Sequence, residues 1–189
     1  MNLPNKLTLL RIVLVPFFVF FMLAGESGAL RLAALVVFVV ASLTDMLDGK
    51  IARKYNLITN FGKLMDPLAD KVLVMSAMIC FVALGYAPAW VVIVILTREF
   101  LVTSLRLIAA GEGLVIAADN WGKIKTVTQM FWVIWTVFWL WVQTVADLTG
   151  IVAVGQLLMP ILMYASVFFT LLSGFNYVWK NRALLFSDM

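Results

Sequence analysis

Long runs of apolar residues alternate with short polar or glycine-containing breaks along the whole chain. Most runs are about as long as the roughly 20 residues that an α-helix needs to cross a bilayer core about 30 Å thick. The pattern therefore predicts an all-α fold, an integral membrane bundle of six transmembrane helices that forms a single domain over residues 1–189. The expected helices cover about residues 5–24, 29–54, 60–84, 88–111, 121–147 and 152–180.

The breaks between the runs consist of residues that interrupt helical hydrogen bonding or favour turns. They contain Gly25 and Gly28, Gly85 and Pro88, Gly111 and Gly113, and Thr149 and Gly150. We therefore expect short turns between the helices and almost no extramembrane domain.

The composition agrees with a membrane protein and narrows the possible chemistry. Of the 189 residues, 64% are hydrophobic and 13% are charged, whereas an average soluble protein is about half apolar and a quarter charged. The chain has no histidine and one cysteine, Cys80. An intramolecular disulfide and cysteine-based metal sites are thereby excluded, and zinc and haem lose their usual ligands.

The basic residues predict how the helices are oriented in the membrane. The net charge of +4 does not indicate nucleic-acid binding, since lysine and arginine gather in the cytoplasmic loops of membrane proteins. The loops at the opposite helix ends contain only Arg31. We therefore expect a multi-pass protein of the cell membrane with both termini in the cytoplasm. The residues on the cytoplasmic side are Lys6, Arg11, Lys50, Arg53, Lys54, Lys63, Lys123, Lys125, Lys180 and Arg182.

Four aspartates lie at the predicted cytoplasmic ends of the second and third helices. Asp45 and Asp48 are three residues apart, so they share one helical face. Asp66 and Asp70 are four residues apart and share a face of the next helix. Carboxylates in a membrane are costly, and four that converge repel one another unless cations neutralise them. Oxygen ligands without histidine or cysteine favour Mg²⁺ or Mn²⁺, and two such ions about 3.5–4 Å apart commonly serve displacement at phosphorus.

Each of these features has a structural alternative. The aspartates could instead pair with neighbouring basic side chains in a solvated belt at the membrane surface, namely Lys50, Arg53, Lys63 and Lys71. The small residues Gly49, Ala52 and Gly62 would let a substrate approach the backbone, or they would serve close helix packing. A secondary transporter also places carboxylates in membrane helices, but it should show inverted repeats and helices broken at the midplane.

The aspartates belong to a longer motif, D-x2-D-G-x2-A-R-x8-G-x3-D-x3-D. It has eight fixed positions over 26 residues, namely Asp45, Asp48, Gly49, Ala52, Arg53, Gly62, Asp66 and Asp70. This motif resembles the signature of the CDP-alcohol phosphotransferases. The resemblance implies six transmembrane helices in a homodimer, with two divalent ions, Mg²⁺ or Mn²⁺, held on the diphosphate of a CDP-linked donor.

The resemblance also implies a role for each motif residue. Asp45, Asp48 and Asp66 would be metal ligands, and Asp70 would be both a ligand and the general base. Arg53 would hold the donor phosphate, unless it is only a cytoplasmic anchor of the helix. The donor-binding set would be Asn5, Thr8, Arg11, Asp48, Gly49, Ala52, Arg53 and Gly62. For Asn5, a helix cap is the alternative.

Cations in the second half of the chain indicate the acceptor. Arg98 and Arg106 lie within the fourth predicted helix, and Lys123 and Lys125 open the fifth, whose N-terminus also attracts anions. Such a group suits an acceptor that carries its own phosphate. Ordinary loop charge is the alternative for the two lysines, and an ion pair between Glu99 and Arg106 is the alternative in the fourth helix.

The same region resembles the branch of the family that uses glycerol 3-phosphate. The residues that carry this likeness are Thr97-Arg98-Glu99-Phe100 with Ser104, Leu105 and Arg106, then Gly122-Lys123-Ile124-Lys125-Thr126 and Gln129, and the opening residues 3–12. The implied reaction transfers the phosphatidyl group from CDP-diacylglycerol to sn-glycerol 3-phosphate and releases CMP on the cytoplasmic side of the bilayer. The alternative within the family is a cardiolipin synthase, whose acceptor is phosphatidylglycerol.

Overall fold

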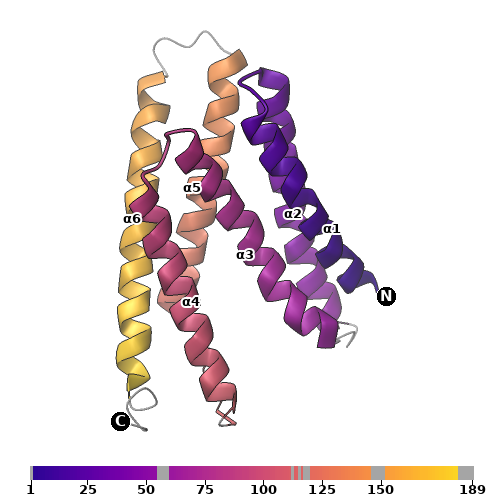
Figure 1. The fold of residues 1–189 in the computed structure, drawn as a ribbon, viewed down its shortest axis with the longest axis vertical. Coiled ribbons are helices and arrows are strands. Elements are labelled where there is room, and N and C mark those ends of the chain that lie inside the picture. Colours follow the sequence, from indigo (N-terminus) through magenta and orange to yellow (C-terminus); the bar gives the residue numbers. More distant parts are fainter. Residues whose placement is uncertain are drawn as a thin grey trace. The chain divides into compact units, whose positions relative to one another are not determined.

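The computed structural model describes residues 2–54, 60–111, 113, 114, 116, 120–145 and 152–182. Within these ranges, the side chains of residues 46–54, 60, 61, 63, 64, 66, 67, 70, 152 and 153 are outside the description. The described residues form six α-helices and no strand (Figure 1), which confirms the predicted all-helical fold. The helices are α1 (Leu3–Leu23), α2 (Gly28–Lys54), α3 (Asn60–Ala83), α4 (Ala89–Gly111), α5 (Asn120–Val145) and α6 (Val152–Lys180).

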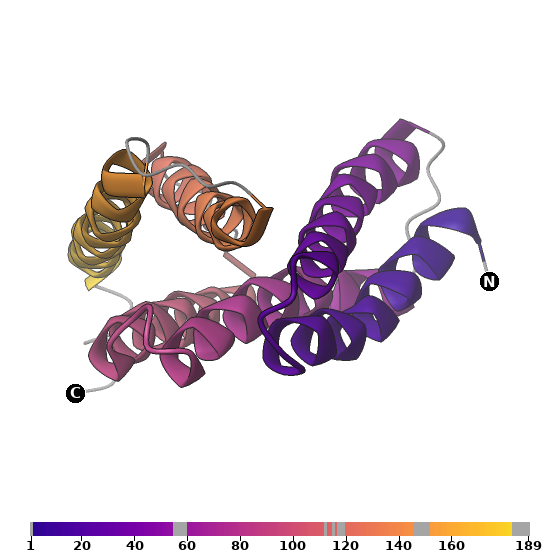
Figure 2. The ribbon, with the colours of Figure 1, turned by 90° about the horizontal axis from the view of Figure 1, so that it is seen from above.

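Contacts between residues divide the chain into two compact units. The first unit comprises Met1–Tyr86 and Val133–Gly155, and the second comprises Ala87–Trp132 and Gln156–Met189. In the first unit α1 packs against both α2 and α3 (Figures 1 and 2).

One face of α1 is buried in the first unit. Its buried residues recur every three or four positions, as expected for a helix that packs along one stripe; they are Pro4, Asn5, Thr8, Arg11, Val15, Phe18 and Met22. The ring centroids of Phe18 and Phe38 of α2 lie 5.5 Å apart. At the end of α1, the buried Arg31 side chain donates a hydrogen bond to the Met22 carbonyl oxygen at 2.8 Å. This bond satisfies one of the carbonyls that a helix C-terminus leaves unpaired.

Two of the predicted breaks are helix ends made by glycine. Gly85 follows α3 with a φ of +79°, and Gly113 follows α4 with a φ of +75°. A left-handed glycine after the last helical turn lets the next backbone N–H reach back to a helix carbonyl. Gly28 was expected in a turn, but it begins α2, where an added Cβ would lie 2.9 Å from the Thr144 hydroxyl oxygen. The expected break at Thr149 and Gly150 lies outside the described residues.

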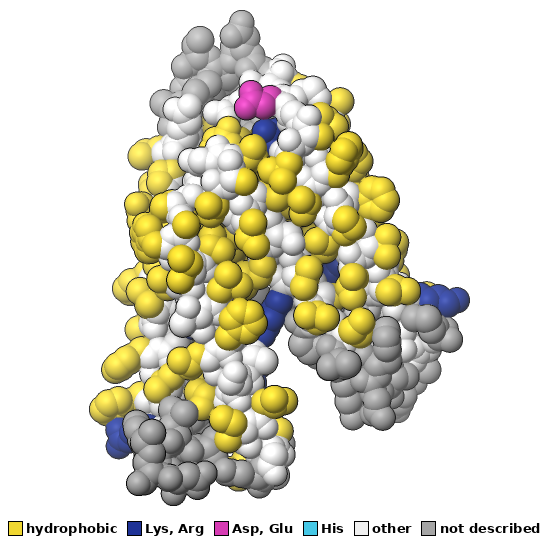
Figure 3. All heavy atoms as spheres, in the orientation of Figure 1, with side chains coloured by type: hydrophobic (Ala, Val, Ile, Leu, Met, Phe, Trp, Pro, Cys, Tyr) yellow, Lys and Arg dark blue, Asp and Glu magenta, His cyan; other side chains and the backbone are white. Residues whose placement is uncertain are grey.

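Large apolar side chains are exposed along the helices. Phe20, Leu107 and Phe175 are 61%, 75% and 69% exposed, and hydrophobic side chains cover much of the face in Figure 3 while described charged side chains are few. Among the described residues, three helical segments are long and apolar enough to cross a membrane: Leu3–Leu23, Gly28–Asp45 and Val154–Lys180. In a membrane protein such side chains face lipid, where their exposure costs nothing. The chain is therefore a membrane protein.

Candidate active site

The two aspartate pairs lie on neighbouring helices of the first unit. α2 carries positions 45 and 48 in its C-terminal part, and α3 carries positions 66 and 70 near its start. Because both segments are helical, each pair is spaced by about one turn, as the sequence predicted. The side chains of Asp48, Asp66 and Asp70, and those of Ala52 and Arg53, lie outside the described residues, as does Gly49. Gly62 is buried in α3.

Of the four motif aspartates, Asp45 is the one whose side chain lies within the described part of the structure. It pairs with an arginine from α1. The Arg11 Nη1 atom lies 2.6 Å from Asp45 Oδ1, with the Arg11 side chain fully buried and the Asp45 side chain 39% exposed. Arginine keeps its charge when buried, so α1 holds a permanent positive charge against the acidic end of α2. The sequence placed Arg11 at the donor site but did not predict its pairing with Asp45.

Three candidate donor residues share the buried face of α1. Asn5 is 7% exposed, and Thr8 and Arg11 are fully buried. The Thr8 hydroxyl donates to the Pro4 carbonyl oxygen at 3.1 Å. α1 begins at Leu3 with Asn2 as its N-cap residue, so the interpretation of Asn5 as the helix cap is wrong. Asn5 lies inside the first turn of α1 and faces the unit's interior.

The second unit contains a separate cluster of charges, formed by Arg98, Glu99 and Lys125. Glu99 Oε1 lies 3.0 Å from Arg98 Nη1 and 2.5 Å from Lys125 Nζ. The three side chains are 13%, 12% and 5% exposed. Two cations thus share one carboxylate oxygen in a largely buried cluster, where charges persist only with close partners.

Arg106 does not join this cluster. Its Nε atom donates to the Tyr177 hydroxyl of α6 at 3.1 Å, and its guanidinium lies 5.5 Å from the centroid of the Tyr177 ring. The alternative of a Glu99–Arg106 ion pair is therefore wrong, since Glu99 binds Arg98 and Lys125.

The two lysines at the start of α5 have different surroundings. Lys125 is buried and joins the cluster with Glu99. Lys123 is exposed on the surface of α5, as expected because residues two apart on a helix face different directions. The interpretation as an ordinary charged residue of a loop is therefore wrong for Lys125, which is buried within a helix.

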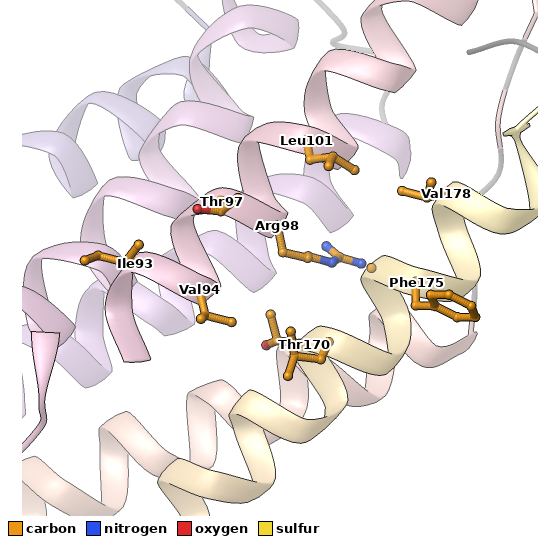
Figure 4. Close-up of a pocket in the computed structure, with 10 residues that line it drawn as sticks. Ile93, Val94, Thr97, Arg98, Leu101, Thr170, Phe175 and Val178 are labelled. Atoms are coloured by element: carbon orange, nitrogen blue, oxygen red, sulfur yellow. The ribbon is translucent and has the colours of Figure 1, made fainter. Parts of the chain in front are cut away.

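Arg98 also forms part of the wall of a cavity of about 440 Å³ between α4 and α6 (Figure 4). Figure 4 shows its side chain extending from α4 toward α6. Apart from Arg98, Thr97, Thr170 and Gly174, the lining consists of apolar side chains, namely Ile93, Val94, Leu101, Leu171, Phe175 and Val178. The cavity therefore offers a charged group within an apolar wall.

Two glycines make room for the Arg98 side chain. An added Cβ at Gly174 of α6 would lie 3.0 Å from Arg98 Cγ, and one at Gly122 of α5 would lie 3.6 Å from its Nη2. Any side chain at position 174 would press on the stem of Arg98. The guanidinium is thus held where three helices, α4, α5 and α6, come together.

Comparison with known proteins identifies the class to which these two units belong. The family model for CDP-alcohol phosphatidyltransferase matches residues 1–172, and the chain belongs to this family.

Individual relatives cover nearly the whole chain. It is 44% identical to the CDP-diacylglycerol–glycerol-3-phosphate 3-phosphatidyltransferase of Bacillus subtilis, with 95% of each chain covered. It is 36% identical to proteins of the same name from Rickettsia typhi, with 93% of this chain and 94% of the relative covered, and from Shigella flexneri, with 87% and 93% covered.

The contacts of two residues at these sites were not predicted. Glu99 was considered as a partner of Arg106, whereas it is the shared partner of Arg98 and Lys125. The signal for this was a carboxylate next to an arginine in an apolar helix, where charges require partners. Tyr177 binds Arg106 from 71 residues further along the chain. No local pattern marks that contact, because it depends on how α4 and α6 pack.

Proposed function

We propose that the protein transfers the phosphatidyl group of CDP-diacylglycerol to sn-glycerol 3-phosphate, which gives phosphatidylglycerophosphate and CMP. The observation that carries the proposal is the similarity, over 95% of the chain, to a relative named for this reaction. The helical placement of the two aspartate pairs and a cationic cluster suited to an acceptor phosphate both agree with it.

In this proposal the four aspartates, Asp45, Asp48, Asp66 and Asp70, bind two Mg²⁺ or Mn²⁺ ions. These four side chains fit the two ions, since carboxylate oxygens are the ligands that both Mg²⁺ and Mn²⁺ prefer. The Asp45 carboxylate is partly exposed. When bound, the ions would neutralise the donor diphosphate and stabilise the charge that develops on the leaving CMP. The Arg11 guanidinium would fix the orientation of Asp45.

Asp70 acts as the general base. It takes the proton from the 1-hydroxyl of glycerol 3-phosphate, and the hydroxyl oxygen forms a new bond to the phosphorus that bears the lipid. The bond from that phosphorus to the bridging oxygen breaks, and CMP leaves with the electron pair. A well-placed base contributes about 10²- to 10⁴-fold to such a rate.

The remaining motif residues bind the donor. Gly49, Ala52 and Gly62 leave room for the cytidine beside α2 and α3, and Arg53 binds a donor phosphate through its planar fork of N–H groups. The buried face of α1 borders the same site through Asn5, Thr8 and Arg11.

The acceptor phosphate binds the cations of the second unit. Arg98 and Lys125 are the main ligands, since both already lie against the Glu99 carboxylate. Arg106 and Lys123 contribute at the edge of this site.

The assembly and topology complete the proposal. The whole chain, residues 1–189, works as one catalytic domain with its active site facing the cytoplasm. Both termini lie on the cytoplasmic side, where the basic residues gather, and two copies form a homodimer.

The experiment that tests the function measures CMP release by the detergent-purified protein with CDP-diacylglycerol and Mg²⁺. Three acceptors are compared: sn-glycerol 3-phosphate, phosphatidylglycerol and inositol 1-phosphate, each with and without EDTA. We expect activity with glycerol 3-phosphate alone, abolished by EDTA and restored by excess Mg²⁺ or Mn²⁺. Activity that survives EDTA would contradict the role of the aspartates.

Phosphatidylglycerol is the second candidate acceptor, and one observation favours it. The cavity beside Arg98 is lined mainly by apolar side chains, which suits a lipid better than a small polar molecule. Release of CMP with phosphatidylglycerol would assign the protein to cardiolipin synthesis. If no CMP were released with any of the three acceptors, the transporter alternative would have to be considered again.

A further inference from the structure

Glu99 brings two cations from different helices to a single oxygen atom. Arg98 is its neighbour on α4, and Lys125 reaches it from α5. All three side chains are at least 87% buried. Without a carboxylate between them, two buried cations at this separation would repel each other and move apart.

The Arg98 side chain has room for a further hydrogen-bond acceptor. Among the described contacts of the cluster, one carboxylate oxygen meets two cations. The Arg98 Nε atom is buried and makes no hydrogen bond within the described part of the chain, although a guanidinium has five N–H donors. Arg98 also lines the cavity between α4 and α6.

We propose that Glu99 is a positioning residue for the acceptor, which holds Arg98 and Lys125 together as one binding site for its phosphate. This inference rests on the proposed function and adds to it a residue that does not itself touch the reacting atoms. Glu99 acts through the two cations, as outer-shell carboxylates orient the residues that bind a ligand directly. Gly174 and Gly122 assist by leaving space for the Arg98 side chain.

The inference predicts a specific effect of Glu99→Gln. This change keeps the shape of the side chain but removes the charge that draws the two cations together. We expect the KM for sn-glycerol 3-phosphate to rise about tenfold, the size typical of losing an outer-shell partner, while the KM for CDP-diacylglycerol stays within twofold. Glu99→Asp keeps the charge and should lie closer to the wild type than Glu99→Gln.

A merely structural role predicts the opposite order. If Glu99 only filled space, the isosteric Gln variant would be the milder one, and both KM values and the melting temperature would change together. Glu26→Gln is the matched control, because Glu26 is exposed in the turn between α1 and α2. It should leave both KM values unchanged.

A binding measurement separates this inference from the proposed reaction. Calorimetry of the detergent-purified wild type and the Glu99 variants, with inorganic phosphate and then sn-glycerol 3-phosphate as probes, needs no turnover. Phosphate bound about tenfold more weakly by Glu99→Gln would support the inference even if the wild type released no CMP with glycerol 3-phosphate. Unchanged or tighter binding by that variant, or no phosphate binding by the wild type, would overturn it.

Discussion

Charged side chains are paired differently in two regions of the molecule. One is the acidic part of α2 in the first unit, and the other is the cluster of Arg98, Glu99 and Lys125 in the second unit. In the first, one buried arginine, Arg11, meets Asp45 of α2, a helix that carries a second aspartate at position 48. In the second, one carboxylate, Glu99, meets two cations. Charged side chains within a membrane require partners of opposite sign, and the described contacts combine the two signs in opposite proportions at the two places.

Under the proposed function the two units bind different ligands. The aspartates of the first unit would bind metal ions and the donor diphosphate, and the cations of the second unit would bind the phosphate of the acceptor. Substitutions in the two units should therefore affect different substrates.

The largest expected effect concerns the first unit. Asp70→Asn removes the proposed base but leaves most metal ligands, so we expect a loss of kcat of about 10²- to 10⁴-fold with donor binding largely kept. The measurement is CMP release together with direct binding of CDP-diacylglycerol. Asp66→Asn, which removes a metal ligand alone, should weaken donor binding strongly. Equal loss of donor binding in the two variants would contradict the division of roles.

The next effect concerns the second unit. Lys125→Ala and Arg98→Ala each remove a charged donor, worth about 1.5–3 kcal/mol, or about 10- to 150-fold. The KM for glycerol 3-phosphate should rise by that factor. The KM for CDP-diacylglycerol should change much less. Lys123→Ala, two residues from Lys125 but exposed, should have a smaller effect. Equal changes in both KM values would move Arg98 and Lys125 out of the acceptor site.

A third prediction tests the ion pair that joins α1 to α2. Arg11→Met leaves Asp45 without its buried partner, and we expect a loss of about 1–3 kcal/mol in stability, since Asp45 is partly exposed and retains water as a partner. Thermal unfolding in detergent measures this loss. We also expect a higher KM for CDP-diacylglycerol.

The control for that prediction is a second buried arginine between α1 and α2. Arg31→Met removes an arginine of α2 that binds the Met22 carbonyl oxygen at the C-terminus of α1, so it should lower the melting temperature as well. It should leave the KM for CDP-diacylglycerol unchanged. If both variants raise the KM for CDP-diacylglycerol equally, Arg11 affects donor binding only through its contribution to folding.

The sequence predicted those features that depend on local spacing. Six helices follow from the length of the apolar runs, and the shared face of Asp45 and Asp48 follows from helical periodicity. The burial of Lys125 and exposure of Lys123 could not be predicted, because it depends on which side of α5 packs against α4. The contact between Arg11 and Asp45 joins residues 34 positions apart and depends in the same way on the packing of α1 against α2.

The smallest effect tests a feature that the two units share. Gly85 and Gly113 end α3 and α4 with positive φ, and neither has an atom within 4 Å of an added Cβ. Replacement by alanine therefore costs only the left-handed backbone conformation, about 1–2 kcal/mol at each position, with both KM values unchanged. Gly111→Ala is the matched control: it lies in α4 without positive φ and has equally open surroundings, so alanine should be neutral or slightly stabilising there. Equal losses of stability at Gly85 and Gly113 would show that the two units end these helices in the same way. A change of KM in either variant would instead show that a binding site extends to that turn.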